Sequence, residues 1–195
     1  MQARFSRGFV LNLIIIIESA LLLVATIWSL IAKVNLLPLL SNVSPACILG
    51  GIACGLCLSG SSLAVSYIGK RKGDGISWLK HFNELVYKEM GPLFSESTLL
   101  DIVIIAVVSG FCEEILFRGV IQSTLGILTA SILFAFGHFA GPKYIVYVFW
   151  SFAAGLIFGW LALATGSLWT PVMAHMACNF LSLTVLRYKI AREIE

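Results

Sequence analysis

The stretch FVLNLIIIIESALLLVATIWSLIA, Phe9 to Ala32, decides the kind of fold, because this apolar run is broken only by Asn12 and Glu18. A bilayer core about 30 Å thick needs roughly 20 apolar residues in an α-helix. The run follows Arg4 and Arg7 as in a signal peptide, but it exceeds the 7 to 15 apolar residues of such a leader and lacks a convincing cleavage site of small residues. We therefore interpret it as a retained membrane anchor.

The composition of the whole chain is typical of a membrane protein. Of the 195 residues, 59% are hydrophobic and only 12% are charged, whereas about 25% are charged in soluble domains. The mean hydropathy is +0.96. We predict one transmembrane domain, residues 1–195, with the lipid bilayer as its surroundings. The net charge of +3 is small, and we expect no nucleic-acid partner. The five cysteines lie in apolar segments and are interpreted as buried thiols.

Five more apolar runs follow the first. They are Pro45 to Gly69, about Leu99 to Leu125, about Gly126 to Gly141, Tyr144 to Thr165, and Leu168 to Tyr188. The proline in AGPK closes the short fourth run, because proline lacks the donor that would continue a helix. Thr170 and Pro171 resemble an N-cap followed by proline at the first helical position. The predicted fold class is all-α, a polytopic (multi-pass) bundle of about six transmembrane helices with one cytoplasmic amphipathic segment.

The positive charges predict the orientation of this bundle. Six spans place both termini on one side, together with all of the 13 lysines and arginines except Lys33 and Arg118. Cytoplasmic loops are enriched in these residues. We therefore expect both termini in the cytoplasm. The polar segment 70–97 is then a cytoplasmic loop, with apolar residues at helical spacing at Ile76, Leu79, Phe82 or Asn83, Val86 and Met90. It is either a connector along the membrane surface or a gate that delivers substrate.

Two small-residue patterns lie in the uncharged runs. Gly51 and Gly55, like Gly155 and Gly159, are four residues apart, a spacing that permits close helix contact. We expect these contacts within the monomer. CGLC at 54–57 has the spacing of a redox dithiol, but its surroundings do not support that function.

Three charged residues lie inside the third apolar run, in EEILFR. A charged side chain at the centre of a membrane helix costs roughly 2.5 to 3.5 kcal/mol on an insertion scale. Glu114 and Arg118 are four residues apart in the order that favours an intrahelical pair. Glu113 points about 100° away from Glu114 on a helix, and it is free to face another group.

Further polar residues occur in later runs. FAFGHF places His138 in the fourth helix, and PVMAHMACNF places His175 and Asn179 on one face of the last. We expect Glu113 to lie in a common polar site with these three residues. A carboxylate beside a neutral imidazole can deprotonate a water molecule. A histidine N–H and an asparagine amide can donate to the oxygen that becomes negative when water adds to a carbonyl.

These residues carry a family resemblance. EEILFR (Glu113 to Arg118), FAFGH (Phe134 to His138) and HMACN (His175 to Asn179) resemble the motifs of the CAAX protease and bacteriocin-processing family, also called Abi, of intramembrane glutamic endopeptidases. The resemblance covers about residues 101–186, the predicted catalytic core. It implies a helical hydrolase of prokaryotic type in the cell membrane, acting on a membrane-associated peptide or protein without a metal or cofactor. Prenylation of that substrate is left open.

The resemblance also implies roles for the residues. Glu113 and His138 would activate water, His175 and Asn179 would bind the oxyanion, and Glu114 and Arg118 would support the site. One alternative is a zinc protease in which Glu113, His138 and His175 bind the metal. Another is a non-catalytic membrane chaperone or immunity factor that uses the polar cluster for folding or for holding a substrate.

Overall fold

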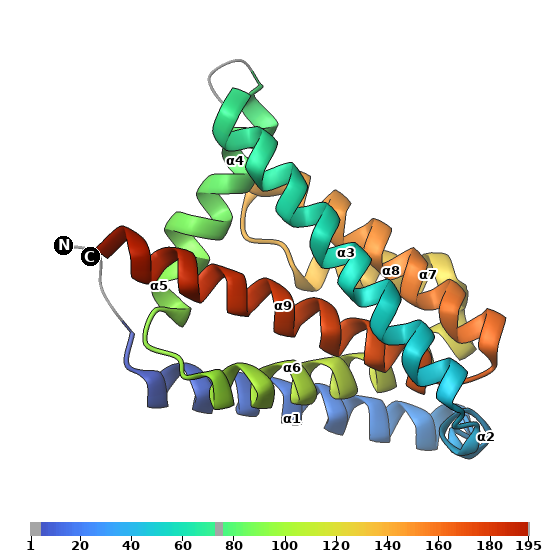
Figure 1. Ribbon diagram of the computed structural model, residues 1–195. Coiled ribbons are helices and arrows are strands. Elements are labelled where there is room, and N and C mark those ends of the chain that lie inside the picture. Colours follow the sequence, from blue (N-terminus) through green and yellow to red (C-terminus); the bar gives the residue numbers. More distant parts are fainter. Residues whose placement is uncertain (1–4, 73–75, 195) are drawn as a thin grey trace.

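The computed structural model describes residues 5–72 and 76–194, which are almost entirely helical and contain no strand (Figure 1). The all-α class is thus confirmed. Residues 73–75, part of the predicted 70–97 segment, and Arg4 lie outside the described residues.

Each of the six apolar runs forms a long helical segment. These segments are α1 (Arg7–Ala32), α3 (Pro45–Lys72), α6 (Leu99–Glu114) with the π-helical η2 (Ile115–Ile121), α7 (Gln122–Gly137), α8 (Ile145–Thr165) and α9 (Trp169–Ile194). Short elements connect them: α2 (Leu37–Ser41), α4 (Ser77–Glu84), η1 (Leu85–Met90), α5 (Gly91–Phe94) and η3 (Pro142–Tyr144). Among the described residues, three stretches are long and apolar enough to cross a membrane: Arg7–Ala32, Pro45–Gly69 and Pro142–Thr165. The number of crossings remains a prediction.

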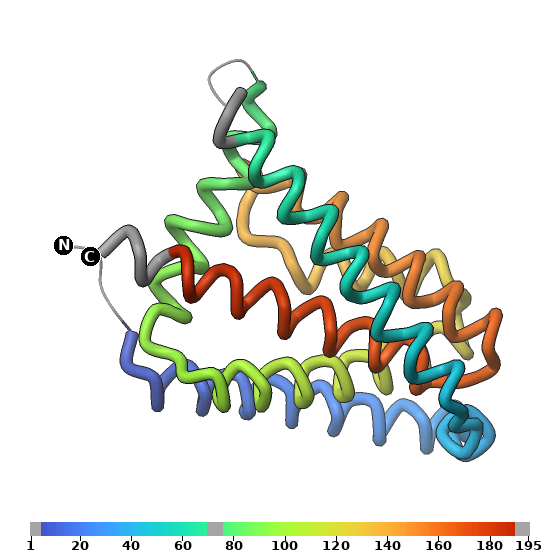
Figure 2. Tube along the Cα trace, viewed as in Figure 1, coloured from blue at the N-terminus to red at the C-terminus, as the bar shows by residue number. Residues whose placement is uncertain are grey.

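Helix α9 packs against α3, α6 and α8, and α1 runs along α6 (Figure 1). The start of α1 and the C-terminal part of α9 lie at the same end of the bundle (Figure 2). Helices α3 and α9 approach closely because Gly51 and Gly55 lack a Cβ, which would collide with the backbone oxygens of Thr170 and Ala174. The expected contact of these glycines within the monomer is confirmed.

Two helix boundaries differ from their predicted positions. Helix α9 begins at Trp169, and the Ser167 hydroxyl accepts a hydrogen bond from the Trp169 N–H at 3.1 Å. Thr170 is therefore not the N-cap; its hydroxyl instead donates to that of Thr165 at 3.1 Å. Helix α7 ends at Gly137, before the proline of AGPK. The predicted break at Gly126 is real, since its φ of 82° and ψ of 166° interrupt the helix.

The segment 77–94, made of α4, η1 and α5, crosses the bundle between α3 and α6, and we call it the strap. Its apolar face is buried in the protein, with Leu79, Phe82 and Leu85 each less than 5% exposed. The Glu84 carboxylate binds the ammonium group of Lys143 at 2.8 Å. This ammonium group holds the pKa of Glu84 below its ordinary value. The strap is therefore fixed to the loop before α8.

Candidate active site

Glu114 forms the centre of a buried charged group at the junction of α6 and η2. Its Oε1 accepts hydrogen bonds from Nη1 of Arg118 at 2.8 Å and from Nδ1 of His175 at 2.9 Å. The side chains of Glu114 and Arg118 are completely buried. Their predicted pairing is confirmed. Because Nδ1 of His175 donates to Glu114, the Nε2 atom of His175 is free to face another group.

The π-helical η2 carries Arg118, whose guanidinium lies over the ring of Phe134, 4.3 Å from its centroid. Its Nη2 donates to the Gly155 carbonyl of α8 at 3.2 Å. The Phe158 ring lies parallel to the His175 imidazole, with centroids 5.2 Å apart. Aromatic faces attract a guanidinium, so these rings hold the cation and the imidazole in fixed positions.

His138 lies just past the last residue of α7, and not inside the helix as predicted. Its Nδ1 bonds the Phe134 carbonyl at 2.9 Å, and its backbone N–H bonds the Ala135 carbonyl at 3.1 Å. A carbonyl only accepts hydrogen bonds, so Nδ1 is the donor, and a neutral His138 has an accepting Nε2. The imidazole thus completes the end of the helix, where carbonyls lack partners.

Asn179 lies one turn beyond His175 on α9. Its amide nitrogen donates to the hydroxyl of Ser109 at 2.9 Å, and this hydroxyl donates to the Ile105 carbonyl at 2.8 Å. The side-chain amide is therefore held from α6. A primary amide has two N–H donors, so one remains for another acceptor.

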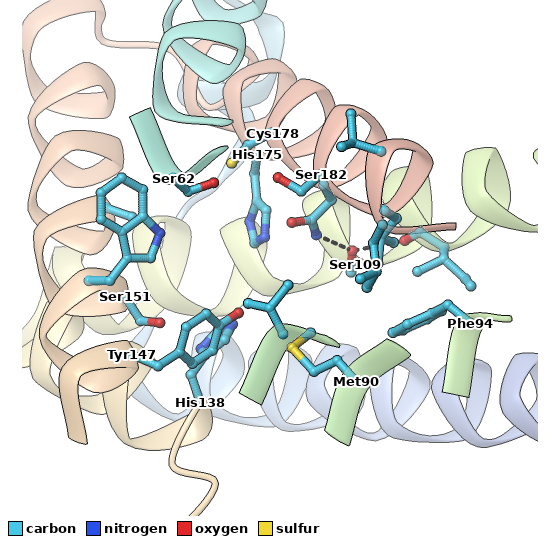
Figure 3. A pocket seen from close by; sticks show the side chains of 18 of the residues that line it. Ser62, Met90, Phe94, Ser109, His138, Tyr147, Ser151, His175, Cys178 and Ser182 are labelled. Carbon is cyan, nitrogen blue, oxygen red and sulfur yellow. Dashed lines mark hydrogen bonds between the residues drawn. The ribbon is translucent and has the colours of Figure 1, made fainter. Parts of the chain in front are cut away.

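A cavity of about 300 Å³ joins these groups. His138, His175 and Asn179 line it, together with Tyr147 and the strap. Figure 3 shows His138, Tyr147 and His175 around the same space, and a hydrogen bond to Ser109 beside it. Most of the remaining lining is aliphatic or aromatic. The cavity can therefore receive an apolar ligand next to polar groups from α7 and α9.

Glu113 is partly exposed and is not among the residues that line this cavity. Its carboxyl group interacts with that of Glu18 on α1 and with His175. It is also close enough to Tyr147 to interact electrostatically. The described residues contain no direct hydrogen bond between Glu113 and His138. Of the four residues expected in a common polar site, His138, His175 and Asn179 line one cavity, and Glu113 is close to His175. The neighbour of Glu113 on α1 was not predicted.

A family comparison covers this part of the chain. Residues 95–181 match the family described as type II CAAX prenyl endopeptidase Rce1-like. The match covers less than half of the chain, and this segment is similar to that family. It contains all six predicted site residues, and with the three apolar helices it indicates a membrane protein.

A bacterial relative extends the comparison. The chain is 31% identical over 121 residues to the uncharacterized protein YpbD of Bacillus subtilis (strain 168). The match covers 58% of this chain and 62% of YpbD, so the chain spans about three fifths of that relative. No solved structure matches the chain significantly.

The Rce1-like segment lacks one feature of the zinc alternative. Within residues 5–72 and 76–194, no group of three histidine, cysteine, aspartate or glutamate side chains is arranged to hold a metal ion.

Two residues of the site were missed in the sequence. Nothing in the sequence indicates that Ser109 belongs to the site, because a single serine in an apolar helix is common. Glu18 could have been identified from the sequence, because it is the only charged residue between Arg7 and Lys33. It lies outside the Rce1-like segment, and only the packing of α1 on α6 brings it to the site.

Proposed function

We propose that this chain is an intramembrane endopeptidase that cleaves a membrane-associated peptide by means of activated water. The observation that carries the proposal is a cavity lined by His138, His175 and Asn179, with Glu113 close enough to His175 to interact electrostatically, within a segment similar to the Rce1-like family. His175 is buried, and Glu113, His138 and Asn179 are partly exposed. The apolar lining of the cavity suits a substrate that approaches from the bilayer.

The proposed reaction begins with a water molecule between Glu113 and His138. Nε2 of His138 accepts a hydrogen bond from this water, since Nδ1 donates to the Phe134 carbonyl. The water oxygen bonds to the peptide carbonyl carbon while one of its protons moves to Glu113. The C–N bond then breaks, and the same proton passes to the leaving amine.

The negative oxygen formed in this reaction is bound by His175 and Asn179. Glu114 accepts from Nδ1 of His175, so Nε2 donates when the imidazole is protonated, and the Glu114 carboxylate balances that charge. Asn179 contributes its second amide N–H. In this scheme Glu114 and Arg118 position His175 and do not touch the substrate.

The test compares the N- and C-termini of membrane proteins in cells that carry the wild type or Glu113→Gln. We expect cleavage products that disappear in the variant while its amount in the membrane is unchanged, because glutamine keeps the shape but removes the proton acceptor. A non-catalytic holding protein would keep its function in this variant. Chelation of purified enzyme should leave cleavage intact, and loss of activity that added zinc restores would contradict the metal-free scheme.

A further inference from the structure

Helix α1 buries one acidic residue and exposes most of its apolar residues. Glu18 is only 5% exposed, whereas its neighbours Ile16 and Ile17 are 66% and 48% exposed. Glu18 and Ile14, which lies one helical turn before it, both line the cavity of the candidate active site. This face of α1 is therefore part of the wall of the cavity.

One oxygen of the Glu18 carboxyl group is left without a partner. The Oε2 atom is buried and has no hydrogen-bond partner in the part of the chain that the structure describes. A buried polar atom without a hydrogen bond is costly. Since Glu18 lines the cavity, its position indicates that a group entering the cavity binds this oxygen.

The charge of the cavity wall indicates what kind of group that is. Among the described residues that line the cavity, Glu18 is the only acidic one, and none is a lysine or arginine. Arg118 is bonded to Glu114, and Arg7 of α1 is bonded to Asp101. Glu18 itself forms no ion pair with any described side chain. The wall thus presents a carboxyl group to which a cationic group of a ligand is complementary.

The rest of the wall suits the stem of a basic side chain. Lysine and arginine combine a long apolar stem with a charged tip. The cavity has a volume of about 300 Å³. Apolar residues from α1, the strap and α6 line it, among them Ile14, Met90, Phe94 and Ile105. A long side chain can therefore lie against these residues while its charged tip reaches Glu18.

We propose that Glu18 binds the ammonium or guanidinium group of a substrate lysine or arginine, so that the enzyme cleaves near a basic residue. The inference rests on the proposed function, because it names the class of peptide that the same site takes. His175 and Asn179, which bind the oxyanion in that scheme, line the same cavity as Glu18. The basic residue therefore lies close to the cleaved bond. Glu18 determines specificity and takes no part in the proton transfers.

The first test needs no cleavage. Its probes are n-hexylammonium, which resembles a lysine side chain, and n-hexanol, which has the same stem without the charge. We expect the amine to raise the unfolding temperature of the purified wild type in a non-ionic detergent more than the alcohol does. This excess should vanish in Glu18→Gln and remain in the exposed control Glu96→Gln. Glu18→Met replaces Glu18→Gln if the latter does not fold.

Two results of this test would overturn the inference. One is equal stabilisation of the wild type by the amine and the alcohol. The other is an excess for the amine that persists when Glu18 is replaced, because the cation would then bind elsewhere.

The second test uses a peptide with a cleavage site found in the comparison of termini, and a matched peptide in which methionine replaces the basic residue nearest the cleaved bond. Loss of one partner of a buried charge pair weakens binding by roughly 30-fold or more. Glu18→Gln should therefore raise KM for the basic peptide by about this factor and leave kcat nearly unchanged. KM for the methionine peptide should be the same in both enzymes.

The outcomes separate this inference from the proposed function. Cleavage sites without a nearby lysine or arginine would overturn the inference, as would an equal rise in KM for both peptides, which indicates a structural role of Glu18. Amine binding without discrimination between the peptides would assign Glu18 to another amine, such as a lipid head group, and would also overturn it. Normal cleavage by Glu113→Gln would instead reject the proposed function, and the amine test would still report on Glu18.

Discussion

Glu113 and Glu114 are adjacent in sequence but lie in different environments. Glu114 is completely buried and bonded to Arg118 and His175, so its charge is committed to other side chains. Glu113 is partly exposed and has a carboxyl group for a neighbour, Glu18. The first environment suits a carboxylate that positions other groups. The second suits one that exchanges protons.

Glu114→Gln should destabilise the protein. Glutamine has nearly the same shape, but it leaves the buried Arg118 charge unbalanced, and breaking a buried ion pair costs about 3 to 5 kcal/mol. We expect a lower yield of folded protein and a lower unfolding temperature in detergent. Glu96→Gln, at an exposed position, is the matched control and should behave as the wild type. A stable but inactive Glu114→Gln would assign the proton-accepting role to Glu114.

Asn179→Ala should impair the reaction more than substrate binding. The amide is held by Ser109 and donates to charge that develops during the reaction. Loss of one such donor lowers kcat by about 10² to 10³, whereas KM should change much less. Asn12→Ala, at an exposed position on α1, is the control. A large increase in KM with unchanged kcat would show that Asn179 binds the substrate ground state.

For single residues, the sequence predicted contacts within one helix better than contacts between side chains of different helices. The bond between Glu114 and Arg118 follows from their spacing on one helix, as does the common face of His175 and Asn179. The bond of His175 to Glu114 and the approach of Glu18 to Glu113 depend on how α9 and α1 pack on α6. Spacing along the chain contains no information on either packing arrangement.

Among the helices, the contact between α3 and α9 depends on glycine residues of α3, which have no side chain. Gly51 and Gly55 allow the backbone of α9 to approach, and α9 carries His175 and Asn179. The GxxxG spacing predicted a close contact, but the identity of the partner helix required the structure.

Helix ends were predicted within a few residues. The difference that matters for the site is at His138, whose side chain bonds the Phe134 carbonyl at the end of α7. The spacing of apolar residues cannot predict such a bond.

Gly55→Ala should weaken the packing of α3 on α9. The added methyl group would overlap the Ala174 carbonyl, and overpacking of this kind costs about 1 to 3 kcal/mol. The same change at Gly50 meets no atom within 4 Å, so Gly50→Ala is the control and should be neutral or slightly stabilising. Thermal unfolding in detergent compares the two. We expect a lower unfolding temperature for Gly55→Ala, and equal temperatures for both variants would contradict this account of the contact.

For the whole molecule, the bundle leaves an apolar surface that only lipid would cover favourably. Leu30 and Ile31 of α1 and Phe149 and Leu163 of α8 are each more than 60% exposed. The polar groups of the site lie inside, as is required for ionisable residues at membrane depth. Composition was sufficient to predict this class of protein. The number and direction of the crossings depend on where each loop lies, which apolar content does not specify.

The last prediction concerns orientation in the membrane. The start of α1 and the C-terminal part of α9 lie at one end of the bundle, as an even number of crossings requires (Figure 2). All lysines and arginines except Lys33 and Arg118 fall on the terminal side of a six-span arrangement, and such residues are retained in the cytoplasm. Reporter fusions after Glu195 and before Met1 should both report a cytoplasmic location, and a fusion in the loop at Gly166 should report the opposite side. A fusion at Lys80 in the strap should agree with the termini. If the two termini reported opposite sides, the six-span arrangement would be wrong.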